Sequence, residues 1–186
     1  MVAYHDDEWG VPLHDERRLF EMLCLEGAQA GLSWSTILNR REGYRAAYEG
    51  FDAERMADYS DERQAELLTD VRIIRNRAKV RAFRENARAV LRLRQSDGGL
   101  DGYLWAWVDG TPIVSDYAEL ADIPPQTALS ERISKDLKAR GFGFVGPTIV
   151  YAYMQSTGTV DDHTADCFRR AADSSSGVER LPPPLR

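Results

Sequence analysis

The sequence predicts an all-α fold. Apolar residues recur at helical spacing in several stretches, and a capping Ser or Asp precedes four of these stretches. No stretch shows the alternation and hairpin turns that are typical of paired strands, apart from one short extended piece, "TPIVSD" at 111–116. The chain has 186 residues, of which 43% are hydrophobic, and this is enough for one core. We expect a single helical domain over residues 1–170.

The first half of the chain contains four of the expected helices. A side chain that accepts hydrogen bonds from free backbone N–H groups stands at the start of each, namely Asp15, Ser33, Asp52 and Ser60. The helices that follow these caps are expected over 16–30, 34–48, 53–59 and 61–70. Gly31 is placed to close the first of them, because glycine adopts the left-handed conformation that ends many helices.

A strongly basic segment follows, "RIIRNRAKVRAFRENARAVLRLR" at 72–94. Its one acid is Glu85, and its nine basic residues are Arg72, Arg75, Arg77, Lys79, Arg81, Arg84, Arg88, Arg92 and Arg94. The segment carries +8 in a chain of net charge −6, so the remaining residues carry −14. Apolar residues at helical spacing predict a helix with one core-facing stripe. The basic face is either a solvated surface or a surface that binds phosphates.

The second half of the chain contains three more expected helices. A short aromatic one lies between glycines at 99–110, and an amphipathic one over 127–140 ends at Gly141. A third begins at Pro147, since proline suits the first turn of a helix. The serine- and proline-rich end of the chain, 171–186, is expected to be a disordered tail.

Composition limits the location and the class of the protein. Mean hydropathy is −0.46 and no apolar run has the length of a membrane span, so no membrane partner is expected. The N-terminal residues lack the basic and apolar regions of a signal peptide. Cys24 and Cys167 form no disulfide framework and are typical of a reducing cytoplasm. The negative net charge by itself argues against a nucleic-acid partner, but it conceals the basic segment.

The stretch "DDHTADC" at 161–167 contains two residue types that bind zinc. If it is helical, His163 and Cys167 project from one face, four residues apart, and supply half of a zinc site. The alternative is an ordinary helix surface that carries a histidine and a half-buried thiol.

Three stretches together resemble one known family. "AYHDDEWGVP", "LFEMLCLEGAQAGLSWSTIL" and "RGFGFVGPTIVYAYMQSTGTVDDH" are similar to bacterial 3-methyladenine DNA glycosylase I, the constitutive alkylation-repair enzyme. The similarity runs from Val2 to about Cys167. It implies a helix-hairpin-helix fold, hydrolytic excision of 3-methyladenine from alkylated double-stranded DNA, and a structural zinc that joins the two ends of the chain. We expect a monomer in the cytoplasm.

The resemblance implies a ligand set for the zinc. His5 would join His163 and Cys167, because imidazoles and a thiolate suit this metal. The family's fourth ligand is a cysteine that precedes the tyrosine–histidine pair by more residues than stand before Tyr4 here. Three explanations are open: the start is truncated, water fills the fourth position, or the site holds no metal. A truncated start is the one we favour. Cys24 lies on an apolar helix and is not the substitute.

A base pocket is also implied by the resemblance, with Tyr4, Trp9, Glu26 and Trp34 as its residues. A base attacked in duplex DNA is flipped out and held between apolar or aromatic faces. In DNA, 3-methyladenine is positively charged, so electron-rich rings bind it and it leaves without a strong acid. Glu26 is assigned the catalytic role, in which it accepts hydrogen bonds from the amino edge of the base. Without the resemblance, Glu26 would be a solvated helix residue and the tryptophans would be core.

The basic segment would be the second half of the hairpin motif. "VRIIR" at 71–75 would form the turn, and Arg72, Arg75, Arg77 and Lys79 would contact phosphates without reading sequence. The turn contains no glycine, although one is expected at Arg72 so that the backbone can approach DNA closely.

Two other functions remain open. A non-catalytic helix-hairpin-helix protein would keep the basic segment and lose the pocket. A zinc hydrolase would use His5, His163 and Cys167, with activated water in the fourth position. We expect neither a catalytic aspartate nor a lysine nucleophile.

Overall fold

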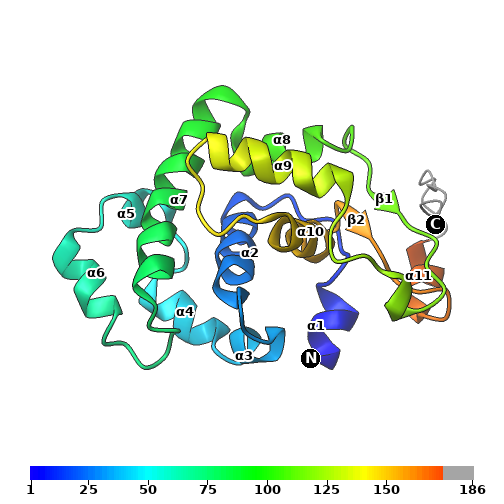
Figure 1. The fold of residues 1–186 in the computed structure, drawn as a ribbon, viewed down its shortest axis with the longest axis horizontal. Coiled ribbons are helices and arrows are strands. Elements are labelled where there is room, and N and C mark those ends of the chain that lie inside the picture. The colour runs from blue at the N-terminus through cyan, green and yellow to red at the C-terminus, as the bar shows by residue number, and fades with distance from the viewer. Residues whose placement is uncertain (174–186) are drawn as a thin grey trace.

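Helices make up nearly all of the regular structure in residues 1–173, the part of the chain that the computed structural model describes (Figure 1). In chain order the helices are α1 (Val2–Asp7), α2 (Glu16–Gln29), α3 (Trp34–Leu38), α4 (Arg41–Ala47), α5 (Ala53–Ala57), α6 (Asp61–Leu67), α7 (Arg77–Ser96), α8 (Gly99–Ala106), the 3₁₀ turn η1 (Leu120–Asp122), α9 (Ala128–Ala139), α10 (Pro147–Ser156) and α11 (Phe168–Asp173). Two short parallel strands, β1 (Ile113–Val114) and β2 (Val160–Asp161), pair Ile113 with Val160. The mostly helical architecture is as predicted, and β1 lies in the extended piece that the sequence indicated.

The four predicted caps are confirmed. Asp15 Oδ1 accepts from the Arg18 N–H at 2.8 Å, and Ser33, Asp52 and Ser60 cap α3, α5 and α6 in the same way. Gly31 has φ +77° and follows the end of α2. The single helix predicted over 34–48 is wrong, because the backbone of Arg40 (φ −105°, ψ 3°) leaves the helical region and separates α3 from α4.

The basic helix, α7, begins directly after the predicted turn at 71–75. Asn76 accepts from the Lys79 N–H at 3.1 Å and caps a helix that starts at Arg77, so residues 68–76 form a non-helical connection from α6. The apolar stripe of α7, including Val80 and Phe83, is buried against α2, α5 and α8. None of the helices in the described part of the chain is both long enough and apolar enough to cross a bilayer.

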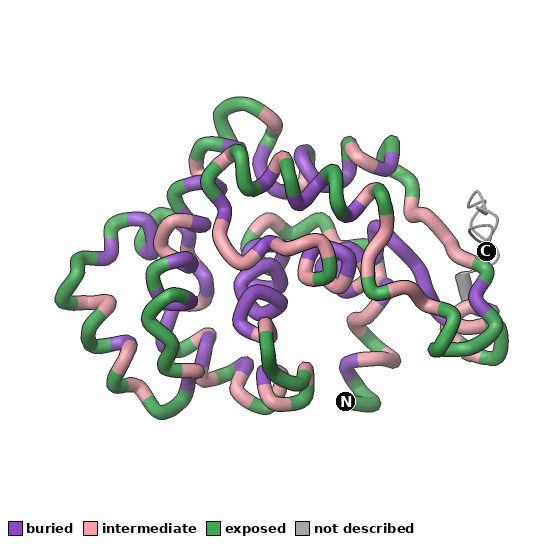
Figure 2. The backbone as a smooth tube through the Cα atoms, in the orientation of Figure 1, coloured by how far each residue is buried: buried purple, intermediate pink, exposed green. Residues whose placement is uncertain are grey.

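Helix α2 lies at the centre of the molecule. Every residue from Leu19 to Ala28 is buried, and the helix packs against α3, α7, α8 and α10 (Figures 1 and 2). A carboxylate in the last turns of such a helix is therefore inside the protein.

The beginning of the described chain lies against its end. The Gly10 N–H donates to the Gln155 carbonyl and the Leu13 N–H donates to the Thr157 carbonyl, both at 3.0 Å. These bonds hold the segment after α1 against the end of α10, close to β2. From the predicted tail, α11 continues to Asp173, and residues 174–186 lie outside the described residues.

The stretch 161–167 is not helical, so the premise of the first zinc argument is wrong. Asp161 ends β2, and the chain then turns, with the Cys167 N–H donating to the Thr164 carbonyl at 3.0 Å. A helix is excluded because Asp161 pairs with Val114 in the sheet. His163 and Cys167 approach each other through this turn instead of through helical spacing.

Candidate active site and metal centre

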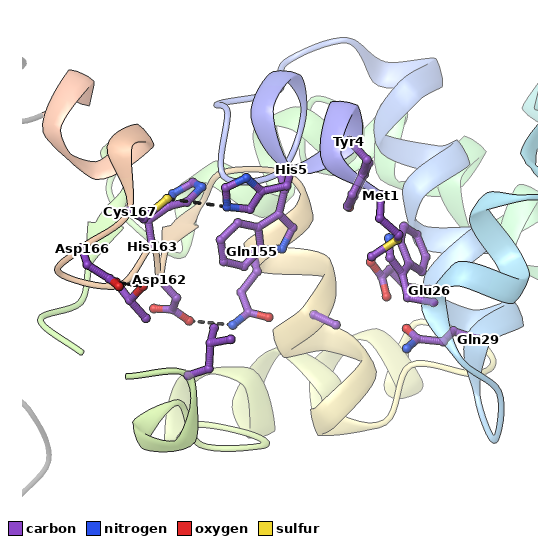
Figure 3. Close-up of a pocket in the computed structure, with 15 residues that line it drawn as sticks. Met1, Tyr4, His5, Glu26, Gln29, Gln155, Asp162, His163, Asp166 and Cys167 are labelled. Carbon is purple, nitrogen blue, oxygen red and sulfur yellow. Dashed lines mark hydrogen bonds between the residues drawn. The ribbon is translucent and has the colours of Figure 1, made fainter. Parts of the chain in front are cut away.

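A cavity of about 490 Å³ opens between α1, the end of α2, α3, α10 and the loop after β2 (Figure 3). The four predicted pocket residues and the three predicted zinc ligands all line it. Elements from both ends of the sequence therefore supply its walls, which is why spacing along the chain gave no sign of one shared cavity.

Glu26 places a carboxylate in a wall of this cavity. The residue is 3% exposed, and its Oε2 atom has no hydrogen-bond partner among the described residues. Burial raises the pKa of Glu26 to about 8, and the Ser156 hydroxyl opposes this shift in part. The charged form is thus destabilised until something in the cavity, such as a cation or a donor, compensates it.

Tyr4 and Trp34 form an aromatic pair in the same cavity. Their ring centroids are 5.4 Å apart, and the ring planes are inclined at 52°. Tyr4 Oη and Trp34 Nε1 are buried and have no hydrogen-bond partner among the described residues. Burial, and then the nearby Glu26 charge, raise the pKa of Tyr4, so its hydroxyl stays protonated. The site offers aromatic faces together with unpaired polar atoms, which is what a flat ligand with polar edges requires.

Trp9 lies at the other end of the cavity. Its ring stacks on His5 at 6.0 Å and meets His163 edge-on at 4.6 Å, measured between centroids. In this arrangement Trp9 contacts both histidines directly and also lines the cavity.

His5, His163 and Cys167 come together as a candidate metal centre. One ligand atom from each lies within 4.8 Å of the other two, and Cys167 Sγ is 3.6 Å from His5 Nε2. The other imidazole nitrogens are engaged: His163 Nδ1 bonds Asp161 at 2.6 Å and His5 Nδ1 bonds Asp6 at 2.7 Å. Ring nitrogens oriented by carboxylates are a common feature of zinc sites.

His163 is the best oriented of the three. It is 3% exposed, and its Nε2 atom has no hydrogen-bond partner among the residues that the structure describes. Burial opposes ionisation of Asp161, but hydrogen bonds from the ring and the main chain of His163 hold the pKa of Asp161 below its usual value. The donor set and the free buried nitrogen fit a metal ion.

Sequence reasoning missed five polar residues of the cavity wall: Gln29, Gln155, Asp162, Thr164 and Asp166. Asp162 is 1% exposed, and its Oδ2 accepts from Tyr151 at 2.5 Å and from Gln155 at 2.7 Å. An acid within two residues of a predicted ligand histidine is a local signal of a carboxylate that orients the ring. This signal marks Asp161, which bonds the His163 ring. Gln29 and Gln155 carry no such signal.

The predicted phosphate contacts separate into two groups. Arg75 and Arg77 are exposed, and Arg72 is exposed while paired with Asp70 at 2.7 Å. Lys79 differs from the prediction, because its side chain is buried and its Nζ atom donates to the Ala28 and Ala30 carbonyls. The reason is geometric: Lys79 lies in the first turn of α7 on the face that packs against α2.

The connection between α6 and α7 accommodates Arg72 without a glycine. No residue from 68 to 76 has a positive φ, so the turn needs no left-handed conformation. Space for Arg72 comes from α4, where a Cβ added to Gly43 would lie 2.8 Å from the Cβ and carbonyl oxygen of Arg72. Gly43 thus lets Arg72 pack closely against α4, and it does not replace a glycine that would bring the backbone of the turn close to DNA.

Comparison with known proteins agrees with this architecture. The model of the family described as methyladenine glycosylase matches residues 1–170. DNA-3-methyladenine glycosylase 1 of Escherichia coli (strain K12) is 47% identical over 166 residues, which cover 89% of this chain and 89% of that protein.

Solved structures agree in fold as well as in sequence. A crystal structure of 3-methyladenine DNA glycosylase I superposes with a TM-score of 0.87 at 49% identity, covering 90% of this chain and 92% of the other. A variant of such an enzyme in complex with 3-methyladenine gives a TM-score of 0.87 at 36% identity, covering 89% of each chain. The chain belongs to the methyladenine glycosylase family.

Proposed function

We infer that this chain hydrolytically excises 3-methyladenine from alkylated DNA and leaves an abasic site. Family membership supports the reaction. Among the features of the site, the buried carboxylate of Glu26 supports it most, because this group opens onto an aromatic-walled cavity with one oxygen unpaired. A flipped cationic base would supply both the donor and the charge that Glu26 lacks.

Base recognition then follows from the chemistry of the cavity. In DNA, 3-methyladenine carries a positive charge, which the Glu26 carboxylate stabilises while accepting hydrogen bonds from the amino edge. Trp34 and Tyr4 present electron-rich faces to the same cation. Unmodified adenine has no such charge, and binding it would leave a buried carboxylate uncompensated.

The chemical step needs little assistance. The bond between C1′ of the sugar and N9 of the base breaks, and its electron pair neutralises the positive charge of the leaving 3-methyladenine. Water adds to C1′ and releases its proton to solvent, which completes a hydrolysis. Glu26 serves this step by holding the cationic base, so we propose it as the catalytic residue in the sense of direct substrate contact.

We propose that α6, residues 68–76 and α7 form a helix-hairpin-helix unit that holds duplex DNA. Arg72, Arg75 and Arg77 lie on its exposed side, and backbone N–H groups at the start of α7 favour a phosphate. Such contacts position the duplex without reading its sequence. We further propose that the protein acts as a monomer in the cytoplasm, where chromosomal DNA of a bacterium is found.

We propose that His5, His163 and Cys167 hold a structural zinc ion. The three ligand atoms come from segments at opposite ends of the described chain, so the metal would join α1 to the loop after β2. When bound, the zinc ion would cross-link these two segments, and it would not activate a water molecule for catalysis. Because α1 carries Tyr4 as well as His5, the join would also hold Tyr4 at the base pocket.

Chromatography of the bases released from methylated DNA tests the activity. The purified protein should release 3-methyladenine, and Glu26→Gln should release it much more slowly. If folded protein releases no methylated base, the proposed activity is wrong and the chain is a DNA-binding relative without glycosylase activity.

A further inference from the structure

The side chain of Lys79 connects the basic helix to the end of the pocket helix. It leaves the first turn of α7 and passes inward, where its Nζ atom is 2.7 Å from the Ala28 carbonyl oxygen and 2.8 Å from that of Ala30. The residue is 7% exposed. A cation that is removed from solvent in this way is tolerated only where it has strong partners.

The partners are carbonyls at the C-terminal end of α2. The last carbonyls of a helix have no partner within the helix and carry partial negative charge, so a cation is favourable there. Helix α2 has no basic residue in its own last turn. Lys79 supplies the missing cation from a different helix.

The segment that Lys79 holds lies between the two main pocket residues. Glu26 stands two residues before Ala28 in the chain, and Trp34 stands four residues after Ala30. Residues 31–33 between them are exposed, and Gly31 takes φ +77°. Within the described part of the chain, the ammonium bonds are the side-chain hydrogen bonds to the main chain of 28–33, and the Ser33 side chain caps α3 at the end of this segment.

A second buried group of α7 acts on the same region through the segment 143–144. Asn86 exchanges two hydrogen bonds with the main chain of Gly143, at 3.1 and 2.7 Å. Phe144 in turn packs against α2, where a Cβ added to Gly27 would lie 3.2 Å from the Cβ of Phe144. The centroid of the Phe144 ring also lies 6.0 Å from Lys79 Nζ, so both buried groups of α7 act on the last turn of α2, Lys79 directly and Asn86 through residues 143–144.

We propose that Lys79 is a positioning residue that fixes the end of α2 and the following loop, so that Glu26 and Trp34 face the same base. Through it, the helix that holds DNA is mechanically linked to the pocket that receives the flipped base. This inference rests on the proposed function and assigns Lys79 a role other than phosphate contact.

Lys79→Met tests the proposal, with Lys138→Met as a control. Lys138 is an exposed lysine on α9, so its substitution removes the same charge from the surface without removing a buried ammonium. Three quantities are measured for each variant: the single-turnover excision rate at saturating protein, the affinity for undamaged duplex, and the salt dependence of that affinity.

In Lys79→Met we expect the excision rate to fall about tenfold or more, since a charged hydrogen bond at the pocket helix is lost. Duplex affinity and its salt slope should equal those of Lys138→Met. A salt slope lowered by about one unit relative to that control would show that Lys79 contacts a phosphate, and would overturn the proposal. An unchanged excision rate would overturn it as well.

The indole N–H resonances give a readout that does not need activity. The chain has four tryptophans, and in Lys79→Met only Trp34 should shift strongly, while Trp105 and Trp107 report an intact core. If this variant does not fold, Lys79→Gln, which keeps a donor without the charge, replaces it. An unmoved Trp34 resonance in a folded variant contradicts the proposal even if wild-type protein releases no base, whereas wild-type inactivity alone contradicts only the proposed function.

Discussion

Glu26→Gln should make this protein more stable and less active at the same time. Burial raises the pKa of the carboxyl to about 8 from an ordinary value of 4.5. Between these two values the folded protein binds more protons than the unfolded chain, so the free energy of unfolding falls as pH rises. Glutamine has nearly the same shape and never ionises, and it removes this dependence.

The size of the effect follows from the two pKa values. At pH 7 the unfolded carboxyl is charged, while the folded one is mostly neutral, so folding binds a proton at a pH about 2.5 units above the ordinary pKa of 4.5. At 1.4 kcal/mol per unit this is a penalty of about 3 kcal/mol in the wild type. For a domain of this size, relief of that penalty corresponds to a melting temperature higher by roughly 5–10 °C.

Urea unfolding at pH 5 and pH 7.5 measures the difference. Wild-type stability should fall between these values by more than that of Glu26→Gln, and the variant should be the more stable protein at pH 7.5. Excision by the variant should be slower by roughly ten- to a hundredfold, the equivalent of a lost charged hydrogen bond. Glu62→Gln is the control, because the Ser60 hydroxyl holds the pKa of exposed Glu62 below its usual value, and no stabilisation is expected. If Glu26→Gln is less stable than wild type at both pH values, Glu26 is a structural residue and the reasoning is refuted.

Four other outcomes are expected. Trp34→Ala should slow excision by about tenfold or more, because stacking of a base on an aromatic ring contributes about 1–3 kcal/mol, and equal rates would exclude the ring from the pocket. The double variant Arg75→Ala/Arg77→Ala should weaken binding to every duplex alike and lower the salt slope by about two units, while an unchanged slope would place the DNA surface elsewhere. A chelator should lower the melting temperature while excision persists at moderate temperature; activity that disappears and returns with zinc in folded protein would instead indicate a zinc hydrolase. Gly10→Ala should lower the melting temperature more than Gly31→Ala. Both glycines have positive φ, but only at Gly10 would the new Cβ lie 2.5 Å from a buried imidazole. Equal losses would show that backbone strain alone causes the effect.

Local signals in the sequence were sufficient for most of the helices. Asp15, Ser33, Asp52 and Ser60 cap their helices because a cap depends only on residues within one turn of it. The same logic failed within 34–48, where one backbone conformation at Arg40 divides the helix.

Only the site residues that lie within the motifs shared with the family could be predicted from the sequence. The family resemblance implied Glu26 and Trp34 for a base pocket and His5 and His163 for a zinc site, but it did not imply that one cavity is lined by all four. Gln155 was not foreseen, because its place in the cavity depends on how α10 packs and no pattern near it marks this.

Lys79 shows most clearly what a sequence pattern omits. Its charge places it in the basic segment, and the pattern cannot reveal that carbonyls of α2 lie within reach of its ammonium group. The same is true of Arg72, which packs closely against Gly43 of another helix. Both depend on pairs of segments that meet only in the folded chain.

The pH dependence of excision tests the central claim that an ionised, buried Glu26 recognises the cationic base. The assay measures kcat/KM on a duplex with a single 3-methyladenine, for wild type and Glu26→Gln, between pH 6 and pH 8. With a pKa of about 8 in the free protein, the ionised fraction of Glu26 rises about fiftyfold over this range, and wild-type kcat/KM should rise with it. The Glu26→Gln profile should be flat. A wild-type profile as flat as that of the variant would contradict the claim.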